Sequence, residues 1–216
     1  MTRNTNARIA GVTYLFYSAI GIGSELLMHQ ARGSVDGDAA EIAHIGQYAT
    51  NVRLTILITL LECLSAFVLA VTLYAITRVE DEELAMLAMV CRVAEGVLGL
   101  LSIPRYLGLL SLTKAGGGTA LREFLLMPGV FIGPIFFAVG SAIFSWLLLR
   151  GRMVPVSIAG LGVFASGLLV VTLPLQLAGF STGPVTGYYQ WAPALVAQTA
   201  LALWLLIKGV AAPATR

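Results

Sequence analysis

The chain has 216 residues, of which 58% are hydrophobic and only 11% are charged, and its formal net charge is +2. A soluble domain of this size carries about a quarter of its residues as charges, and a nucleic-acid-binding domain carries a clear basic excess. The composition therefore excludes both classes. Its few charges lie between long apolar runs, which is typical of a polytopic membrane protein.

Six apolar runs are long enough to cross a hydrocarbon core of about 30 Å as helices. They are continuously apolar, without the alternating segments of about ten residues that mark a membrane β-barrel. We therefore expect an all-α fold and one membrane domain over residues 1–216. The predicted spans cover residues 8–28, 53–77, 84–110, 128–149, 154–177 and 188–208.

The connection between the first two spans, residues 30–52, has a helical pattern of its own. Ile42, Ile45 and Val52 recur at intervals that place them on one face of a helix. This spacing predicts a short amphipathic helix that lies at the outer membrane interface and leads into the second span.

Basic residues in short connections indicate how a membrane protein is oriented. With both termini in the cytoplasm, seven Lys and Arg residues fall on the cytoplasmic side and four on the other. We therefore predict a multi-pass plasma-membrane protein with cytoplasmic N- and C-termini. The cytoplasmic set is Arg3, Arg8, Arg78, Arg150, Arg152, Lys208 and Arg216; the other is Arg32, Arg53, Lys114 and Arg122.

Charged residues also occur inside the spans. Arg92 and Glu95 lie one turn apart on the third span, and the second span carries Glu62. At about 1.5 Å per residue, both glutamates fall near the membrane midplane. Gln198 of the sixth span can face the same interior. We predict that these four residues form a buried binding site between the first three spans and the sixth.

A second polar group is expected nearer the outer surface. It comprises Glu25 of the first span, Arg53 of the second and Arg105 of the third.

The buried charges admit two interpretations. Because a charge in the membrane core costs about 2.5–3.5 kcal/mol on insertion scales, they could form a salt-bridge staple that holds helices together. Alternatively, one arginine between two carboxylates leaves a carboxylate under-compensated, and such a group can bind a proton or a small molecule in transport or sensing. A third class is a partner-binding membrane protein without chemistry.

A membrane-embedded enzyme is the less favoured class. The sequence contains no H-E-x-x-H, G-x-S-x-G or paired-aspartate motif, so we predict no catalytic residue, metal or cofactor. Cys63 and Cys91 lie inside apolar runs, where a cysteine is usually a small buried hydrophobic residue.

Four segments resemble a known family. They are "ARIAGVTYLFYSAIGIGSEL", "LYAITRVEDEELAMLAMVCRVAEGVLG", "LLLRGRMVPVSIAGLGVFASGLL" and "WAPALVAQTALALWLLIKGV". Together they resemble the bacterial membrane family called domain of unknown function 4386, in order and over nearly the whole chain. The resemblance implies six spans in a bacterial or archaeal inner membrane. This chain departs from the family pattern at Gln198, where the family has an acidic residue. It implies no activity.

Overall fold

The computed structural model describes residues 1–34, 37–115, 132–180 and 188–211, and every regular element in these ranges is a helix. The prediction of an all-α chain with six membrane-spanning helices is confirmed. The first four residues of the fourth predicted span, 128–131, lie outside the described ranges. The elements are α1 (Arg3–Arg32), α2 (Asp38–Gln47), α3 (Ala49–Thr77), α4 (Glu82–Leu100), α5 (Ser102–Ala115), α7 (Ile132–Arg150), α8 (Val156–Leu177), the short 3-10 helix η2 (Tyr188–Trp191) and α9 (Ala192–Ile207).

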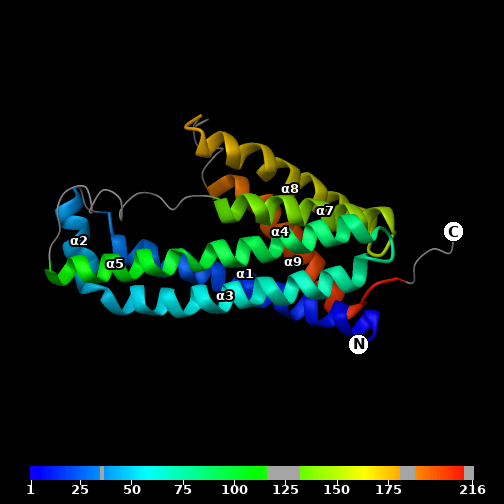
Figure 1. Ribbon diagram of the computed structural model, residues 1–216, viewed down its shortest axis with the longest axis horizontal. Coiled ribbons are helices and arrows are strands. Elements are labelled where there is room, and N and C mark those ends of the chain that lie inside the picture. The colour runs from blue at the N-terminus through cyan, green and yellow to red at the C-terminus, as the bar shows by residue number, and fades with distance from the viewer. Residues whose placement is uncertain (35–36, 116–131, 181–187, 212–216) are drawn as a thin grey trace.

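The spanning helices form a closed ring. Each packs against the next in the order α1, α3, α4, α7, α8 and α9, and α9 returns to α1 (Figure 1). A ring of six helices has an interior, so side chains that point inward from any of them are shielded from lipid.

The third span is two helices rather than one. The segment Glu82–Lys114 is long and apolar enough to cross a membrane, but α4 ends at Leu100 and α5 begins at Ser102. Pro104 accounts for the break, because proline has no N–H to donate to the carbonyl of Leu100 and its ring clashes with that carbonyl.

Three spans are much longer than the others. The spans of α1, α3 and α4–α5 have 30, 29 and 33 residues, whereas α7 has 19. At about 1.5 Å per residue, they reach roughly 15 Å or more beyond α7. Figure 1 shows this extension at the end of the molecule that carries α2, which we call the α2 end.

The predicted short helix in the first connection is present as α2. Ile42 and Ile45 are buried together with Met28 of α1, Val52 of α3 and Leu109 of α5. The apolar face of α2 therefore covers the ends of the three long spans. This packing accounts for the apolar face of the amphipathic pattern.

The N-terminus and the residues that follow α9 up to Ala211 lie at the opposite end (Figure 1). Arg3 donates hydrogen bonds to the carbonyls of Ile76, at 3.3 Å, and Ala211, at 3.5 Å. The Asn4 side chain accepts one from the Val210 N–H at 3.4 Å. We call this the terminal end. An even number of spans requires both termini to lie on one side.

Two connections are tied together at the terminal end. Arg150, at the end of α7, forms ion pairs with Glu80 at 3.0 Å and Asp81 at 3.5 Å. Asp81 also caps α4, because its side chain accepts a hydrogen bond from the Leu84 N–H at 3.1 Å. The acidic residues before α4 therefore also tie the α3–α4 turn to Arg150 at the end of α7.

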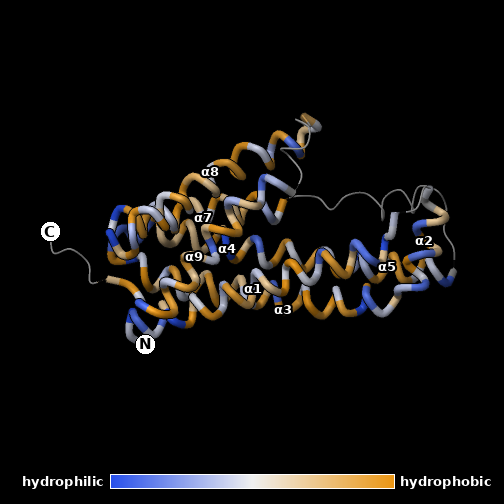
Figure 2. The backbone as a smooth tube through the Cα atoms, turned by 180° about the vertical axis from the view of Figure 1, so that it is seen from behind, coloured by the Kyte–Doolittle hydropathy of each residue, from blue (hydrophilic) through white to orange (hydrophobic). Residues whose placement is uncertain are grey.

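The outward faces of the bundle are hydrophobic. Leu57, Val71, Val90 and Val171 are each at least half exposed, and apolar positions run along the helices in Figure 2. Apolar side chains on the outside suit a lipid solvent, so the exposed surface agrees with the spanning assignment.

Candidate functional site

The guanidinium of Arg92 lies in the interior of the ring. α4 carries this residue on its inward face, where its side chain has 0% exposure. Gly140 lets α7 come close, because a Cβ there would lie 3.2 Å from Arg92 Cγ and 3.0 Å from the Ala88 carbonyl oxygen. Arg92 Nη1 lies 2.7 Å from Glu95 Oε2. The i, i+3 spacing thus places the pair on one helix face.

Two aromatic rings complete this group. Tyr17 of α1 donates its phenolic hydrogen to Glu95 Oε1 at 2.5 Å, a short charge-assisted bond. The guanidinium carbon of Arg92 lies 5.3 Å from the Tyr17 ring centre and 4.9 Å from that of Phe137 on α7, within cation–π range. We call Tyr17, Arg92, Glu95 and Phe137 the ionic cluster.

Charge compensation within the ionic cluster is uneven. Both oxygens of Glu95 have a partner, one in Tyr17 and one in Arg92. Arg92 has five N–H donors, and the Tyr17 hydroxyl lies within hydrogen-bonding reach of its guanidinium. By distance and angle, however, its Nε and Nη2 atoms have no acceptor in the described part of the chain. Since buried donors are nearly always bonded, these two atoms need an acceptor from outside those residues.

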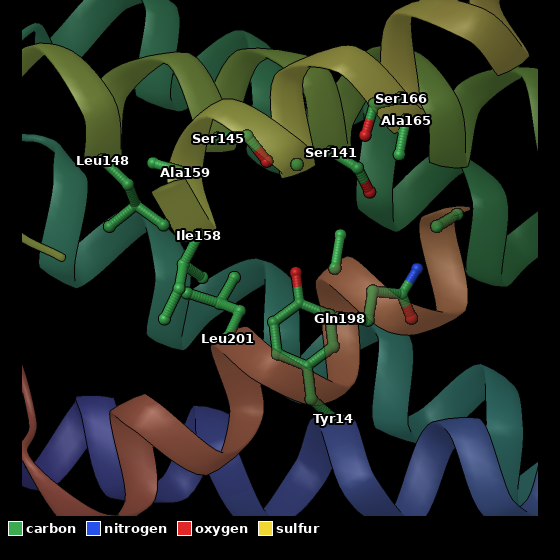
Figure 3. A pocket seen from close by; sticks show the side chains of 13 residues that line it. Tyr14, Ser141, Ser145, Leu148, Ile158, Ala159, Ala165, Ser166, Gln198 and Leu201 are labelled. Carbon is green, nitrogen blue, oxygen red and sulfur yellow. The ribbon is translucent and has the colours of Figure 1, made fainter. Parts of the chain in front are cut away.

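A small cavity whose largely apolar wall carries several hydroxyl groups lies between α1, α7, α8 and α9. Figure 3 shows the hydroxyls of Tyr14, Ser141, Ser145 and Ser166 and the amide of Gln198 around one common space. Its volume is about 20 Å³, which is room for about one water molecule. The Ser141 hydroxyl is buried and has no hydrogen-bond partner in the described chain. We call this space the hydroxyl cavity.

The hydroxyl cavity and the ionic cluster are neighbours along two helices. Tyr14 precedes Tyr17 by one turn of α1, and Ser141 follows Phe137 by one turn of α7. Tyr14 also lies within electrostatic range of both Arg92 and Glu95. The interior of the ring thus contains a charged region and, one turn toward the terminal end, the hydroxyl cavity.

The structure brings together two of the four residues predicted to form the buried site. Arg92 and Glu95 form an ion pair. Glu62 is half-buried on α3 and lies against α1, since its Oε1 atom would be 3.2 Å from a Cβ at Gly21. No ion pair within 4.0 Å joins Glu62 to Arg92, although the two lie within electrostatic range. Gln198 lines the hydroxyl cavity.

The predicted outer polar group lies toward the α2 end. Glu25 and Arg53 are exposed and Arg105 is half-buried. Glu25 and Arg105 each have an interaction partner. Arg53 instead lines a groove between α3 and α5.

Sequence reasoning missed the two aromatic residues of the ionic cluster. Tyr17 continues a line of inward positions on α1, three residues after Tyr14 and four before Gly21. Phe137 lies between Gly133 and Gly140 on the face of α7 that packs on α4. In the sequence, each of these aromatic residues lies at helical spacing from small or polar residues. Ordinary helix packing produces the same pattern, so the pattern does not identify a site.

The described residues contain no group of three metal-ligating side chains. Cys63 and Cys91 are both buried free thiols, as predicted. Among the described residues, the interior offers the Arg92–Glu95 ion pair, the Glu62 carboxyl group and a set of hydroxyl and amide groups.

A model of the family described as "Domain of unknown function (DUF4386)" matches residues 9–209. Neither the curated proteins nor the solved structures contain a match to the chain.

Proposed function

The chain belongs to the DUF4386 family, and on that premise we propose that it is a membrane protein that binds a small polar solute, or a proton, inside its helix ring. The site comprises the ionic cluster and the hydroxyl cavity, and binding serves transport or sensing.

One observation carries the proposal: Arg92 is fully buried and two of its nitrogen atoms lack an acceptor in the described chain. An unpaired buried donor costs about 1–3 kcal/mol, and more when it is charged. A solute that offers acceptor oxygens would remove this penalty on binding. A carboxylate is the simplest such group, because its two oxygens match the planar fork of an arginine.

The hydroxyl cavity supports the same proposal. Its hydroxyl and amide groups can each donate and accept hydrogen bonds, so they suit a water molecule or the polar end of a small solute. A cavity of about 20 Å³ is too small for a larger ligand, which would have to displace side chains at this site.

Proton binding is a second candidate, and a separate observation favours it. Glu62 lies mid-span on α3 and has no hydrogen bond or ion pair within the described chain. Ionisable groups inside membranes are rare and often belong to proton or ion pathways. Glu62 is therefore the carboxyl group we expect to take up and release a proton.

We also propose a bacterial or archaeal plasma membrane, with both termini in the cytoplasm. The excess of Lys and Arg in the sequence segments assigned to the cytoplasmic side supports this orientation. It places the hydroxyl cavity on the cytoplasmic side of the ionic cluster.

Solute binding can be tested by heat unfolding of the purified full-length chain in detergent. A fluorogenic maleimide that reacts with Cys63 and Cys91 reports unfolding, because both thiols are buried in the folded state. Formate is the smallest carboxylate and needs the least displacement of side chains around Arg92. We expect it to raise the unfolding midpoint of the parent protein, since a ligand that binds only the folded state stabilises it.

The matched variants are Arg92→Lys and Arg78→Lys. Each substitution keeps the positive charge and removes the planar guanidinium. Arg78→Lys is the control, because Arg78 is exposed at the end of α3. The ligand-induced rise in the unfolding midpoint should disappear in Arg92→Lys and persist in Arg78→Lys. If Arg92→Lys does not fold, Tyr17→Phe replaces it as the site variant. If no small carboxylate shifts the parent, or if Arg92→Lys responds like the parent, the solute proposal is wrong and the ionic cluster is a staple between helices.

Proton binding has its own test. Infrared difference spectra between acidic and alkaline buffer should contain a protonated-carboxyl band that is absent from Glu62→Gln. Glu83→Gln, the same change at an exposed position on α4, should leave the band unchanged. A band that survives in Glu62→Gln would exclude Glu62 as the proton site.

A further inference from the structure

An open groove lies between α3 and α5 at the α2 end, away from the ionic cluster. Its volume is about 550 Å³, and it is mostly apolar. α5 packs against both α2 and α3 in this region. The lining of the groove includes Arg53 and Leu57 of α3 and Leu107 and Lys114 of α5.

The polarity of the groove changes along the membrane normal. Arg53 lies near the start of α3 and Lys114 at the end of α5, so both cations are at the α2 end. Leu57 lies one turn deeper on α3, and Leu107 lies two turns deeper on α5. A ligand that fits this gradient has a negative group at the membrane surface and an apolar tail below it.

Within the described residues, no acidic side chain pairs with either of these two cations. Both side chains are exposed. Two positive charges at the mouth of an apolar groove complement a phosphate group. They lie at the level where a phospholipid carries its phosphate, if α3 and α5 span the bilayer.

We propose that this groove binds an acidic glycerophospholipid. Its phosphate lies between Arg53 and Lys114, and one acyl chain lies on Leu57 and Leu107. These leucines are 59% and 54% exposed, so the floor of the groove is continuous with the lipid-facing surface and a bilayer lipid can enter from the side. A soluble phosphate would leave that floor uncovered. This inference does not depend on the function proposed above.

The test is native mass spectrometry of the full-length chain in a neutral detergent. The protein is mixed with equal amounts of phosphatidylglycerol and phosphatidylcholine that carry the same acyl chains. We expect bound phosphatidylglycerol to exceed bound phosphatidylcholine. Replacing both cations, Arg53→Ala with Lys114→Ala, should weaken phosphatidylglycerol binding roughly 25-fold, because each basic residue near an anionic surface contributes about 1 kcal/mol and 1.4 kcal/mol is tenfold.

The matched control removes two exposed cations at the terminal end, Arg8→Ala with Lys208→Ala, and should bind phosphatidylglycerol like the parent. Leu107→Trp, which fills the apolar floor, should weaken binding of both lipids without lowering the unfolding midpoint. Three results would each overturn the proposal: equal binding of the two lipids by the parent, equal losses in the two double variants, or displacement of the lipid by millimolar inorganic phosphate.

Discussion

The close approach of α1 and α9 closes the helix ring, and it depends on Gly11. A Cβ at this position would lie 2.7 Å from the Ala202 carbonyl oxygen and 2.8 Å from the Leu206 nitrogen. Both are backbone atoms of a helix, so neither can rotate away. We therefore expect Gly11→Ala to force the two helices apart.

The size of the effect follows from these distances. Ordinary contacts between heavy atoms lie at about 3.5–4.0 Å, so the added methyl group is roughly 0.8 Å too close. Overpacking of this kind costs about 1–3 kcal/mol. Alanine also favours a helix over glycine by about 1 kcal/mol, which offsets part of the cost.

Gly23→Ala isolates that helix preference. Gly23 lies on the same helix, and a Cβ there would meet nothing within 4 Å. The difference between the two variants is therefore the packing cost alone. For a chain of this length, about 1–3 kcal/mol corresponds to roughly 2–12 °C in the unfolding midpoint.

The assay is heat unfolding in detergent, followed by the reaction of Cys63 and Cys91 with a fluorogenic maleimide. We expect Gly11→Ala to unfold several degrees below Gly23→Ala, which should match or exceed the parent. If Gly11→Ala unfolds at the same temperature as Gly23→Ala, α1 and α9 do not approach as closely as described, and the ring is open between them.

Three further results are expected from the same unfolding assay. Arg92→Leu should lower the free energy of unfolding by about 3–5 kcal/mol, because it leaves Glu95 buried without its cation. Adding Glu95→Leu should recover part of that loss. If the two changes are additive instead, the residues are not paired. Tyr17→Phe should cost about 1.5–3 kcal/mol, the range for a hydrogen bond to a charged group, and an unchanged midpoint would mean that another donor replaces the phenol. Arg150→Ala should lower the free energy of unfolding by less than about 1 kcal/mol despite two ion pairs, because the side chain is 36% exposed and solvent screens both pairs. A larger loss would indicate that Arg150 fixes the α3–α4 turn to the α7–α8 turn.

Much of the fold could be predicted from the sequence because the hydrocarbon core of a membrane offers no hydrogen-bond partners to the backbone. Only helices satisfy the backbone within one span, and each of the six apolar runs coincides with helical segments. The pairing of Arg92 with Glu95 was also predictable, since residues three apart share a helix face. The amphipathic pattern in residues 42–52 predicted α2.

Other features depend on contacts between distant segments. Tyr17 and Phe137 meet Arg92 from two other helices, 75 residues before it and 45 residues after it. Nothing in the local pattern distinguishes them from other aromatic residues on helix faces. The position of Gln198 is similar: its place on the sixth span was clear, but only the ring order puts it beside Tyr14 rather than Arg92.

The sequence by itself determined the class of protein, the positions of the spans and the presence of charge within them. These properties follow from hydropathy and helical spacing, which act over a few residues. The tertiary structure decided which charges are paired: Arg92 bonds Glu95 and faces two aromatic rings, whereas Glu62 lies against α1 at Gly21. That outcome depends on the rotation and close packing of whole helices, which glycines such as Gly140 permit.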